Sequence, residues 1–213
     1  HLLTRSMQKT GETNKVVILV ATSGDTGKAA LEGFADVPGT QIIVFYPSEG
    51  VSDIQKQQMI TQAGKNVKVF GIEGNFDDAQ RGVKEIFGNT ALSDELAKKG
   101  YTFSSANSIN WGRLVPQIVY YFSAYVDAVK AGKITAGDPI NFVVPTGNFG
   151  DILAGYYAKL MGLPIDRLLC ASNSNNVLTD FINTGVYDRR REFFKTVSPS
   201  MDILVSSNLE RLL

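Results

Sequence analysis

The sequence predicts an α/β protein with parallel, doubly wound sheets and helices on both faces. Short β-branched runs alternate with longer segments of helical periodicity, and this alternation is typical of βαβ units. Residues rich in Gly, Ser, Thr and Asn follow three of the strand-like runs. Because the carboxyl ends of parallel strands lie at one edge of a sheet, that edge is the expected ligand site.

The predicted elements alternate along the chain. The strand-like runs are Val16–Ala21, Gln41–Tyr46, Val67–Ile72, Tyr101–Ser105, Ile140–Val144 and Leu168–Ala171. The segments with helical periodicity are Asp25–Ala35, Ser52–Ala63, Phe76–Lys99, Trp111–Ala131 and Phe149–Met161. Ser52 with Gln55 indicates a capping box, and Ser93 is placed to cap the turn Asp94–Lys99.

Two domains are expected, because glycine and proline residues mark a linker within the chain. The stretch 130–139 holds two glycines and a proline after a long helical segment, which is typical of a linker. We therefore place a smaller α/β domain at residues 1–132 and part of a larger one at residues 133–213. The chain begins without methionine and ends in an apolar run that Asn208 is placed to cap as a helix start. We accordingly expect a piece of a longer protein, with the second domain incomplete.

Composition excludes several classes of function. Lys plus Arg and Asp plus Glu both number 21, and this zero net charge argues against nucleic acid or an anionic membrane as a partner. Cys170 and His1 are the only residues of their kinds, so a Cys-rich zinc site, a histidine-based triad and a metal site are not expected. Since no apolar run could span a bilayer and no signal peptide is present, a cytoplasmic protein is expected.

The first candidate loop follows the run Val16–Ala21. Gly24 and Gly27 let the backbone approach a ligand closely, while Ser23 and Thr26 supply hydroxyl groups. The start of the next helix favours a carboxylate or a phosphate. The spacing is not that of a P-loop, which has four residues between its glycines. A plain tight turn would also require glycine here, and that interpretation stays open.

The second candidate loop follows the run Ile140–Val144. It contains Gly147, Asn148, Phe149 and Gly150, and then a helix begins. This spacing does not match the dinucleotide fingerprint G-x-G-x-x-G, but it fits a nest of backbone N–H groups around one phosphate. A simple turn between strand and helix is again the alternative.

The third candidate loop follows the run Tyr101–Ser105. Asn107, Ser108 and Asn110 can hydrogen-bond a ligand, and Arg113 carries a planar group suited to phosphate or carboxylate. A capped helix start with a surface arginine is the alternative. Three such junctions at one sheet edge predict a cleft for a small ligand with two or three anionic groups.

Five segments carry a family resemblance that extends over nearly the whole chain. They are Ala21–Gly27, Pro145–Asp151, Phe76–Asp78, Ser105–Gln117 and Ser198–Arg211. The first resembles the substrate loop of fold-type II pyridoxal-phosphate (PLP) enzymes, and the second resembles their cofactor-phosphate loop. In combination the segments are similar to those of the threonine synthases.

The resemblance implies a PLP-dependent lyase of threonine biosynthesis that converts O-phospho-L-homoserine and water to L-threonine and phosphate. It implies that backbone N–H groups across Gly147–Asp151 hold the cofactor phosphate. It also implies that Asp25 lies beside the cofactor's phenolic oxygen, where relatives carry Asn. The residues implied to lie near the substrate carboxylate are Ser23, Gly24, Thr26 and Gly27. Those implied to bind the substrate phosphate are Asn107, Ser108 and Arg113.

The chain departs from the family in one respect. The family's Schiff-base lysine lies in a motif resembling Thr-x-Ala-Phe-Lys-Asp, and no lysine here has these neighbours. The family pattern places that lysine N-terminal of His1, in a helix with its tail at Leu2–Lys9. No catalytic residue and no activity are therefore expected from this chain alone. Two alternatives stay open: another fold-type II enzyme, such as a dehydratase or a sulfhydrylase, and a non-catalytic anion-binding domain.

Overall fold

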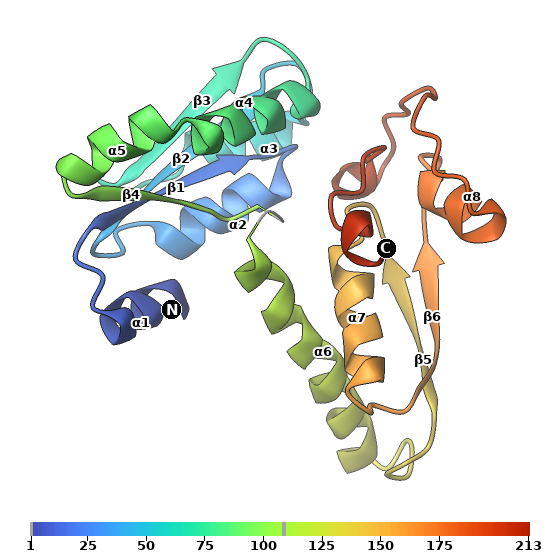
Figure 1. Cartoon of the computed structure of the whole chain (residues 1–213). Helices are drawn as coiled ribbons and strands as arrows, with labels where there is room; N and C mark the ends of the chain where they lie inside the picture. Colours follow the sequence, from blue (N-terminus) through green and yellow to red (C-terminus); the bar gives the residue numbers. More distant parts are fainter. Residues whose placement is uncertain (1, 108–109) are drawn as a thin grey trace. The chain divides into compact units, whose positions relative to one another are not determined.

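A computed structural model describes residues 2–107 and 110–213 of the chain (Figure 1). The chain divides into two units, His1–Asn107 and Ser108–Leu213, and each has its own sheet.

The first unit holds four parallel strands in the order β3-β2-β1-β4. The strands are β1 (Lys15–Ala21), β2 (Thr40–Pro47), β3 (Val67–Ile72) and β4 (Tyr101–Ser105). The helices are α1 (Leu2–Thr10), α2 (Asp25–Phe34), α3 (Asp53–Ile60), α4 (Phe76–Gly88) and α5 (Thr90–Lys98). Six of the seven residues of β1 are buried, which explains why the strand is a continuous apolar run.

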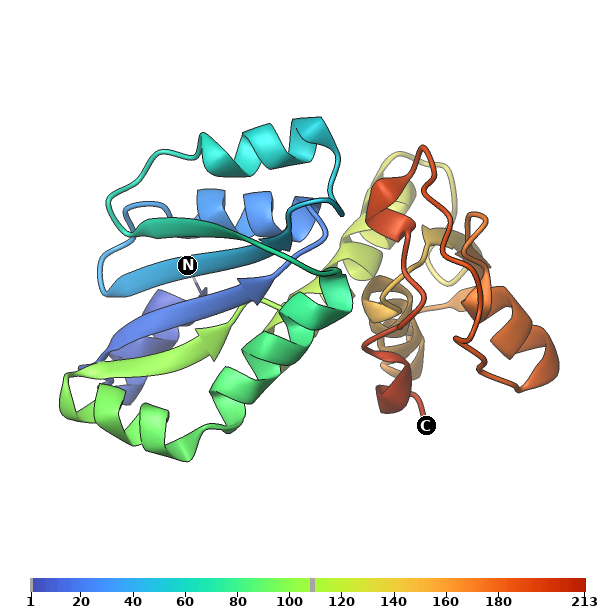
Figure 2. The same cartoon turned by 90° about the horizontal axis from the view of Figure 1, so that it is seen from above.

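Helices cover both faces of this sheet, as the sequence predicts. Val16, Ile18 and Val20 of β1 share one core cluster with Leu31 of α2 and Met59 of α3. The alternate residues of β1 pack on the opposite face against α4. Figure 2 shows α2 and α4 on opposite sides of the strands. The prediction of a parallel α/β sheet is confirmed for this unit.

The helix boundaries in this unit follow local capping. Ser52 and Gln55 form the predicted capping box at the start of α3. The prediction of one helix across Phe76–Lys99 is wrong, because the helix breaks at Asn89. The Asn89 side chain accepts a hydrogen bond from the backbone N–H of Leu92 and so caps α5, a role that the sequence had assigned to Ser93.

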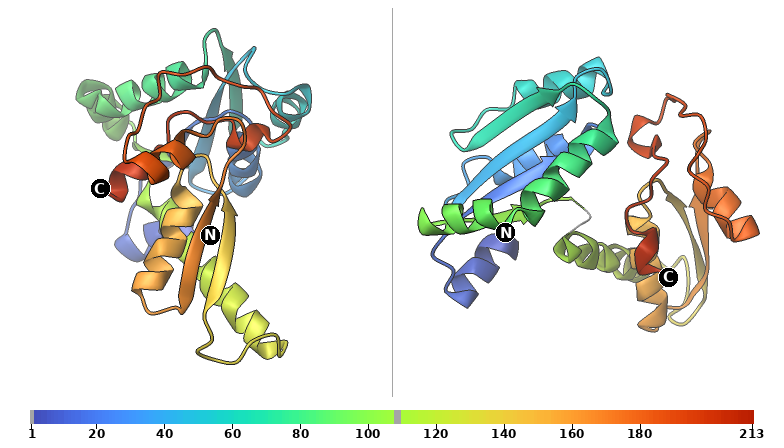
Figure 3. Two further views of the ribbon diagram at one scale, coloured as in Figure 1. Left: turned by 90° about the vertical axis from the view of Figure 1, so that its right-hand side faces the viewer. Right: turned by 45° about the horizontal axis from the view of Figure 1, so that its top comes forward.

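The second unit is built on two parallel strands, β5 (Ile140–Pro145) and β6 (Ile165–Ala171). Its helices are α6 (Trp111–Lys130), α7 (Gly150–Leu160), α8 (Val177–Thr184) and the short 3₁₀ turns η1 (Pro199–Met201) and η2 (Leu209–Arg211). Figure 3 shows the strands side by side with α7 against them. Tyr121 of α6 packs edge-on against Phe142 of β5 with ring centroids 4.8 Å apart. β6 begins three residues before the predicted run, and α8 was not predicted.

The division between units differs from the predicted domain boundary near residue 133. α6 ends just before that point, but it packs against α7 and its Leu114, Tyr121 and Tyr125 belong to the core of the second unit. The glycines and the proline at 130–139 therefore form a turn inside the second unit. The compact division lies earlier, after Asn107.

Over the two described ranges, no helix has both the length and the apolar character needed to cross a membrane.

Candidate functional site

The loop between β1 and α2 is organised by the hydroxyl of Thr22. This side chain is 1% exposed, and its Oγ1 accepts hydrogen bonds from the N–H groups of Gly24 at 2.9 Å and Gly27 at 2.8 Å. The hydroxyl therefore joins the loop to the first turn of α2. Sequence reasoning singled out the neighbours Ser23 and Thr26 and missed Thr22. The signal was a hydroxyl residue at a strand end, two residues before a glycine.

Gly24 is required where α3 approaches the loop. Its φ is +143°, which an L-residue with a side chain rarely adopts, and a Cβ there would also overlap the side-chain amide of Gln55. Gln55 is itself buried, and its Nε2 donates to Oδ1 of Asp25 at 2.9 Å. The capping glutamine of α3 thus orients the first acidic residue of α2. Ser23 and Thr26 are half-buried at the same junction.

The end of β4 is joined to the end of β1 through Asn107. Its Oδ1 accepts from the N–H of Ala21 at 2.8 Å, and its Nδ2 donates to the carbonyl of Ala21 at 2.6 Å. The side chain is 7% exposed, so its amide sets the spacing of two strand ends. Ser105 reinforces the junction, because its Oγ donates to the carbonyl of Leu19.

The remaining residues of the third predicted loop belong to the second unit or lie outside the described residues. Ser108 is outside them. The Asn110 side chain caps α6 by accepting from the N–H of Gly112 at 2.9 Å. Arg113 lies in the first turn of α6, where burial lowers the pKa of its guanidinium. The group remains a cation at neutral pH. Asn107 and Arg113 thus belong to different units.

The loop between β5 and α7 presents backbone N–H groups. Phe149 adopts the left-handed conformation with φ +64°, and the N–H of Gly150 donates to Oδ1 of Asn148 at 2.9 Å. In the part of the chain that the structure describes, no hydrogen bond uses the N–H groups of Gly147, Asn148, Phe149 or Asp151. Successive N–H groups at a helix start form a nest for an anion, so this loop fits a phosphate group. We call residues 147–151 the anion loop.

The carbonyl oxygens of the anion loop have partners in the segment 206–208. The Ser206 hydroxyl donates to the carbonyl of Gly147 at 2.5 Å. The backbone N–H and the Nδ2 of Asn208 both donate to the carbonyl of Asn148, each at 3.1 Å. Asn208 directly precedes η2, where the sequence predicts a helix start, but its side chain makes no capping hydrogen bond there. Its polar groups instead hold a loop about sixty residues earlier in the chain.

Asp151 is the last residue of the anion loop, and its side-chain carboxyl group is half-buried. The Tyr121 hydroxyl donates to the Asp151 carbonyl at 2.8 Å and lies 3.2 Å from its Oδ1. Burial raises the pKa of the Asp151 carboxyl, and the hydrogen bond from Tyr121 opposes that shift in part. A carboxyl that retains its proton more readily repels a neighbouring anion less.

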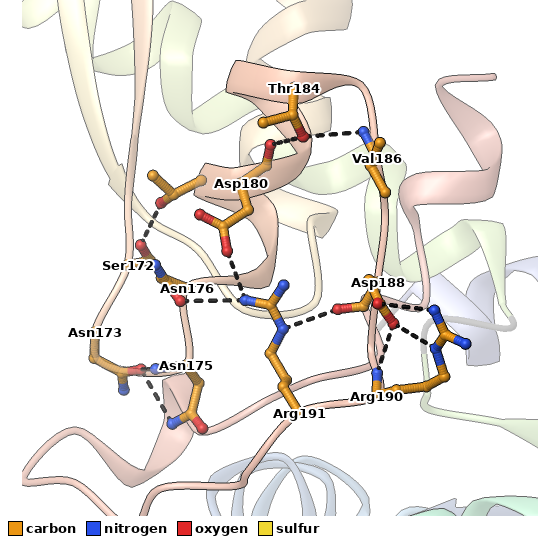
Figure 4. A network of polar contacts seen from close by, with 11 residues as sticks. Ser172, Asn173, Asn175, Asn176, Asp180, Thr184, Val186, Asp188, Arg190 and Arg191 are labelled. Carbon is orange, nitrogen blue, oxygen red and sulfur yellow. Dashed lines mark hydrogen bonds and ion pairs between the residues drawn. The ribbon is translucent and has the colours of Figure 1, made fainter.

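A further polar loop follows β6 at the same edge. Pro145 is paired with Ala171, and the N–H of Thr146 donates to the Ala171 carbonyl at 2.8 Å, so the two loops leave adjacent strand ends. Figure 4 shows this region, with Arg191 at its centre. Arg191 bonds Oδ2 of Asp180 at 2.7 Å and the carbonyl of Asp188 at 2.8 Å. A run of charged residues such as 188–192 usually forms a solvated surface, so the sequence alone does not reveal this structural contact of Arg191.

No metal site emerges from residues 2–107 and 110–213, where no three acidic, histidine or cysteine side chains are grouped suitably.

No family model matches the chain, but known proteins are similar to it over most of its length. Threonine synthase-like 1 of Homo sapiens is 52% identical over 202 residues, which are 92% of this chain and 27% of that protein. Threonine synthase of Pseudomonas aeruginosa is 46% identical over 213 residues, which are 100% of this chain and 43% of that enzyme. The chain is a homologue of threonine synthase. It spans less than half the length of these relatives.

Solved threonine synthases share the fold. A PLP-bound threonine synthase from Brucella melitensis matches with a TM-score of 0.81 and 44% identity, over 99% of this chain and 43% of that one. The yeast threonine synthase matches with a TM-score of 0.80 and 41% identity, over 100% of this chain and 41% of that one. A PLP-dependent aspartate racemase, at a TM-score of 0.62 and 14% identity, shares the fold alone. The predicted α/β fold of the PLP enzymes is therefore confirmed.

In this threonine synthase homologue the predicted site residues fall into two groups, one in each unit, and Arg113 at the start of α6 lies in the second unit. The prediction that all three junctions lie at the edge of one sheet is wrong, because β1 and β4 belong to one sheet and β5 to another. The first unit brings Ser23, Gly24, Asp25, Thr26 and Gly27 together at the start of α2, with Asn107 bonded to the adjoining strand end. The second unit brings Gly147 to Asp151 together before α7.

Proposed function

We propose that this chain supplies the cofactor-phosphate loop and the substrate loops of a PLP-dependent threonine synthase. The enzyme is a lyase that converts O-phospho-L-homoserine and water to L-threonine and phosphate. The anion loop is the observation that carries the proposal, because four backbone N–H groups there are unused by other hydrogen bonds of the described residues. The homology to threonine synthases over nearly the whole chain supports this choice of reaction.

The residues of the anion loop fit the cofactor. Gly147, Asn148, Phe149 and Asp151 would direct N–H groups at its phosphate, and the helix α7 adds a partial positive charge. Gly150 keeps the loop compact, since a Cβ there would lie 3.1 Å from Oδ1 of Asn148. When bound, PLP supplies an electron sink for the substrate's reacting carbon atoms.

The substrate is assigned to the loops of the first unit and the start of α6. The hydroxyl groups of Ser23 and Thr26, together with Gly24 and Gly27, would bind and orient its carboxylate. Asp25, which Gln55 orients, would face the cofactor's phenolic oxygen.

The substrate phosphate is assigned to Asn107, Ser108 and Arg113. Asn107 uses one amide hydrogen for the Ala21 carbonyl, and Nδ2 carries a second one for a ligand. Arg113 would supply the charge-assisted contact to the phosphate.

Turnover is not expected from this chain alone. No lysine of this chain has the sequence neighbours of the family's catalytic lysine, so the chain alone would bind PLP without turnover. The proposed setting is cytoplasmic, with a small-molecule substrate and no nucleic-acid or membrane partner.

Ligand binding to the 213-residue chain tests the proposal. Equilibrium dialysis should show that PLP binds at least tenfold more tightly than pyridoxal, because only PLP carries the phosphate that the anion loop fits. Borohydride reduction followed by mass mapping should find no single preferred lysine. Equally weak binding of PLP and inorganic phosphate would favour a non-catalytic anion-binding domain.

Turnover assays separate the enzymatic alternatives. Threonine formed from phosphohomoserine by this chain would refute its inactivity. In a longer protein that contains the chain and a catalytic lysine, phosphate release from phosphohomoserine is expected. Turnover of serine in its place would indicate a dehydratase or a sulfhydrylase.

A further inference from the structure

We propose that Ser206 and Asn208 are positioning residues that set the direction of the N–H groups in the anion loop. The identification of the anion as a cofactor phosphate rests on the proposed function. The positioning itself rests on hydrogen bonds within the second unit. Both residues are buried, at 6% and 2% exposure, and both donate to carbonyl oxygens of the loop.

The direction of each N–H group follows from the planarity of the peptide bond. In a trans peptide the carbonyl of one residue and the N–H of the next lie in one plane and point in opposite directions. The bond from Ser206 to the Gly147 carbonyl therefore turns the N–H of Asn148 away from Ser206. The two bonds from Asn208 to the Asn148 carbonyl do the same for the N–H of Phe149. Two successive N–H groups are thus directed away from the segment 206–208.

The loop needs such support because its conformation is not the preferred one. Phe149 has φ +64°, a left-handed conformation that L-residues with a side chain rarely adopt. Ser206 is itself held, since its N–H donates to the Tyr187 hydroxyl at 2.7 Å, and that hydroxyl donates to the Leu204 carbonyl at 2.9 Å. The support reaches from the anion loop through the segment 204–208 to Tyr187.

Ser206 and Asn208 differ in how strongly each fixes the orientation of the peptide plane that it bonds. The Gly147 carbonyl has the Ser206 hydroxyl as its one hydrogen-bond donor among the described residues. The Asn148 carbonyl has two donors, of which one is the backbone N–H of Asn208 and survives any substitution of that side chain except proline. Loss of the Ser206 hydroxyl should therefore release its peptide plane more fully than loss of the Asn208 amide.

The test uses the full 213-residue chain and the variants Ser206→Ala, Ser206→Thr and Asn208→Ala. Asn175→Ala is the matched control, because Asn175 is a buried asparagine of the same unit that bonds Phe194 and Asp202 instead of the anion loop. Affinity for inorganic phosphate and for PLP is measured by calorimetry. The orientation of the Asn148 and Phe149 N–H bonds is measured without ligand from residual dipolar couplings.

Ser206→Ala should weaken the binding of both anions about tenfold and change the coupling of Asn148, whereas Asn208→Ala should weaken binding about threefold. Ser206→Thr, which keeps the hydroxyl, should restore affinity, and Asn175→Ala should lose stability with unchanged affinity. Unchanged couplings in Ser206→Ala, or an equal loss of affinity in Asn175→Ala, would overturn the proposal. If the wild-type chain binds neither anion, the proposed function fails, and the couplings still decide the positioning.

Discussion

Substitution of Thr22 by valine tests how the β1–α2 loop is held, because valine keeps the shape of the side chain and removes its hydroxyl. Two buried N–H groups, those of Gly24 and Gly27, then lose their acceptor. A buried donor without a partner costs about 1–3 kcal/mol, which gives roughly 2–6 kcal/mol for the pair. The added methyl group regains about 0.8 kcal/mol of apolar burial. We expect a net loss of about 3 kcal/mol from the stability of the first unit.

Hydrogen exchange measures this loss in the unit where it arises. A destabilisation of about 3 kcal/mol raises the population of the open state by a factor of roughly 150. Peptides from β1 and β2 should therefore exchange about a hundredfold faster in Thr22→Val than in the wild-type chain. The single tryptophan, Trp111, lies in the other unit, so its fluorescence does not replace this measurement.

The variant Thr22→Ser separates the contribution of the hydroxyl to stability from that of the methyl group. Serine keeps the acceptor for both N–H groups and loses one methyl group, so it should cost about 1 kcal/mol. If valine is tolerated as well as threonine, or if serine is as harmful as valine, the hydroxyl does not hold the loop and the reasoning is wrong.

Three further substitutions have defined outcomes. Gly24→Ala should lower the urea midpoint of the first unit by the equivalent of about 2–4 kcal/mol, because its Cβ would overlap Gln55 at a strained φ of +143°. Asp151→Asn should stabilise the chain at neutral pH. Burial raises the pKa of the Asp151 carboxyl in the folded state, so the folded wild-type chain loses stability as the pH rises through that pKa and the carboxyl becomes charged. Asparagine carries no charge at any pH, so the urea midpoints of the two proteins should converge on acidification. Arg191→Ala should cost about 1 kcal/mol by urea denaturation, since its half-buried bonds anchor α8, whereas Arg190→Ala at the exposed neighbouring pair should change nothing measurable.

Much of the fold could be predicted because the pattern of apolar residues in the sequence follows which faces of each strand and helix are buried. β1 is apolar over almost its whole length since both faces of the strand are covered, and β3 and β4 have the predicted bounds. The break at Asn89 was missed because helical periodicity continues across it. α8 was missed because the segment that contains it carries no long apolar stripe.

The candidate site was predictable in part for a similar reason. A glycine next to a strand end is visible in a sequence, and Gly24 and Gly147 do lie where the backbone is crowded. The residues that hold the loops were less visible. Asn208 supports a loop about sixty residues away, and no local pattern reports a hydrogen bond between such distant segments.

The two glycine-containing loops look alike in sequence and differ in which backbone groups remain for a ligand. In the β1–α2 loop, the Thr22 hydroxyl takes the N–H groups of Gly24 and Gly27, so the side chains of Ser23 and Thr26 become the polar groups suited to a ligand. In the anion loop, the protein binds the carbonyl oxygens instead, through the segment 206–208. Among the described residues nothing else accepts from the N–H groups of Gly147, Asn148, Phe149 and Asp151, and successive N–H groups suit a phosphate. This difference, which depends on hydrogen bonds and not on glycine content, supports the proposal that the anion loop binds the cofactor phosphate and the β1–α2 loop binds the substrate carboxylate.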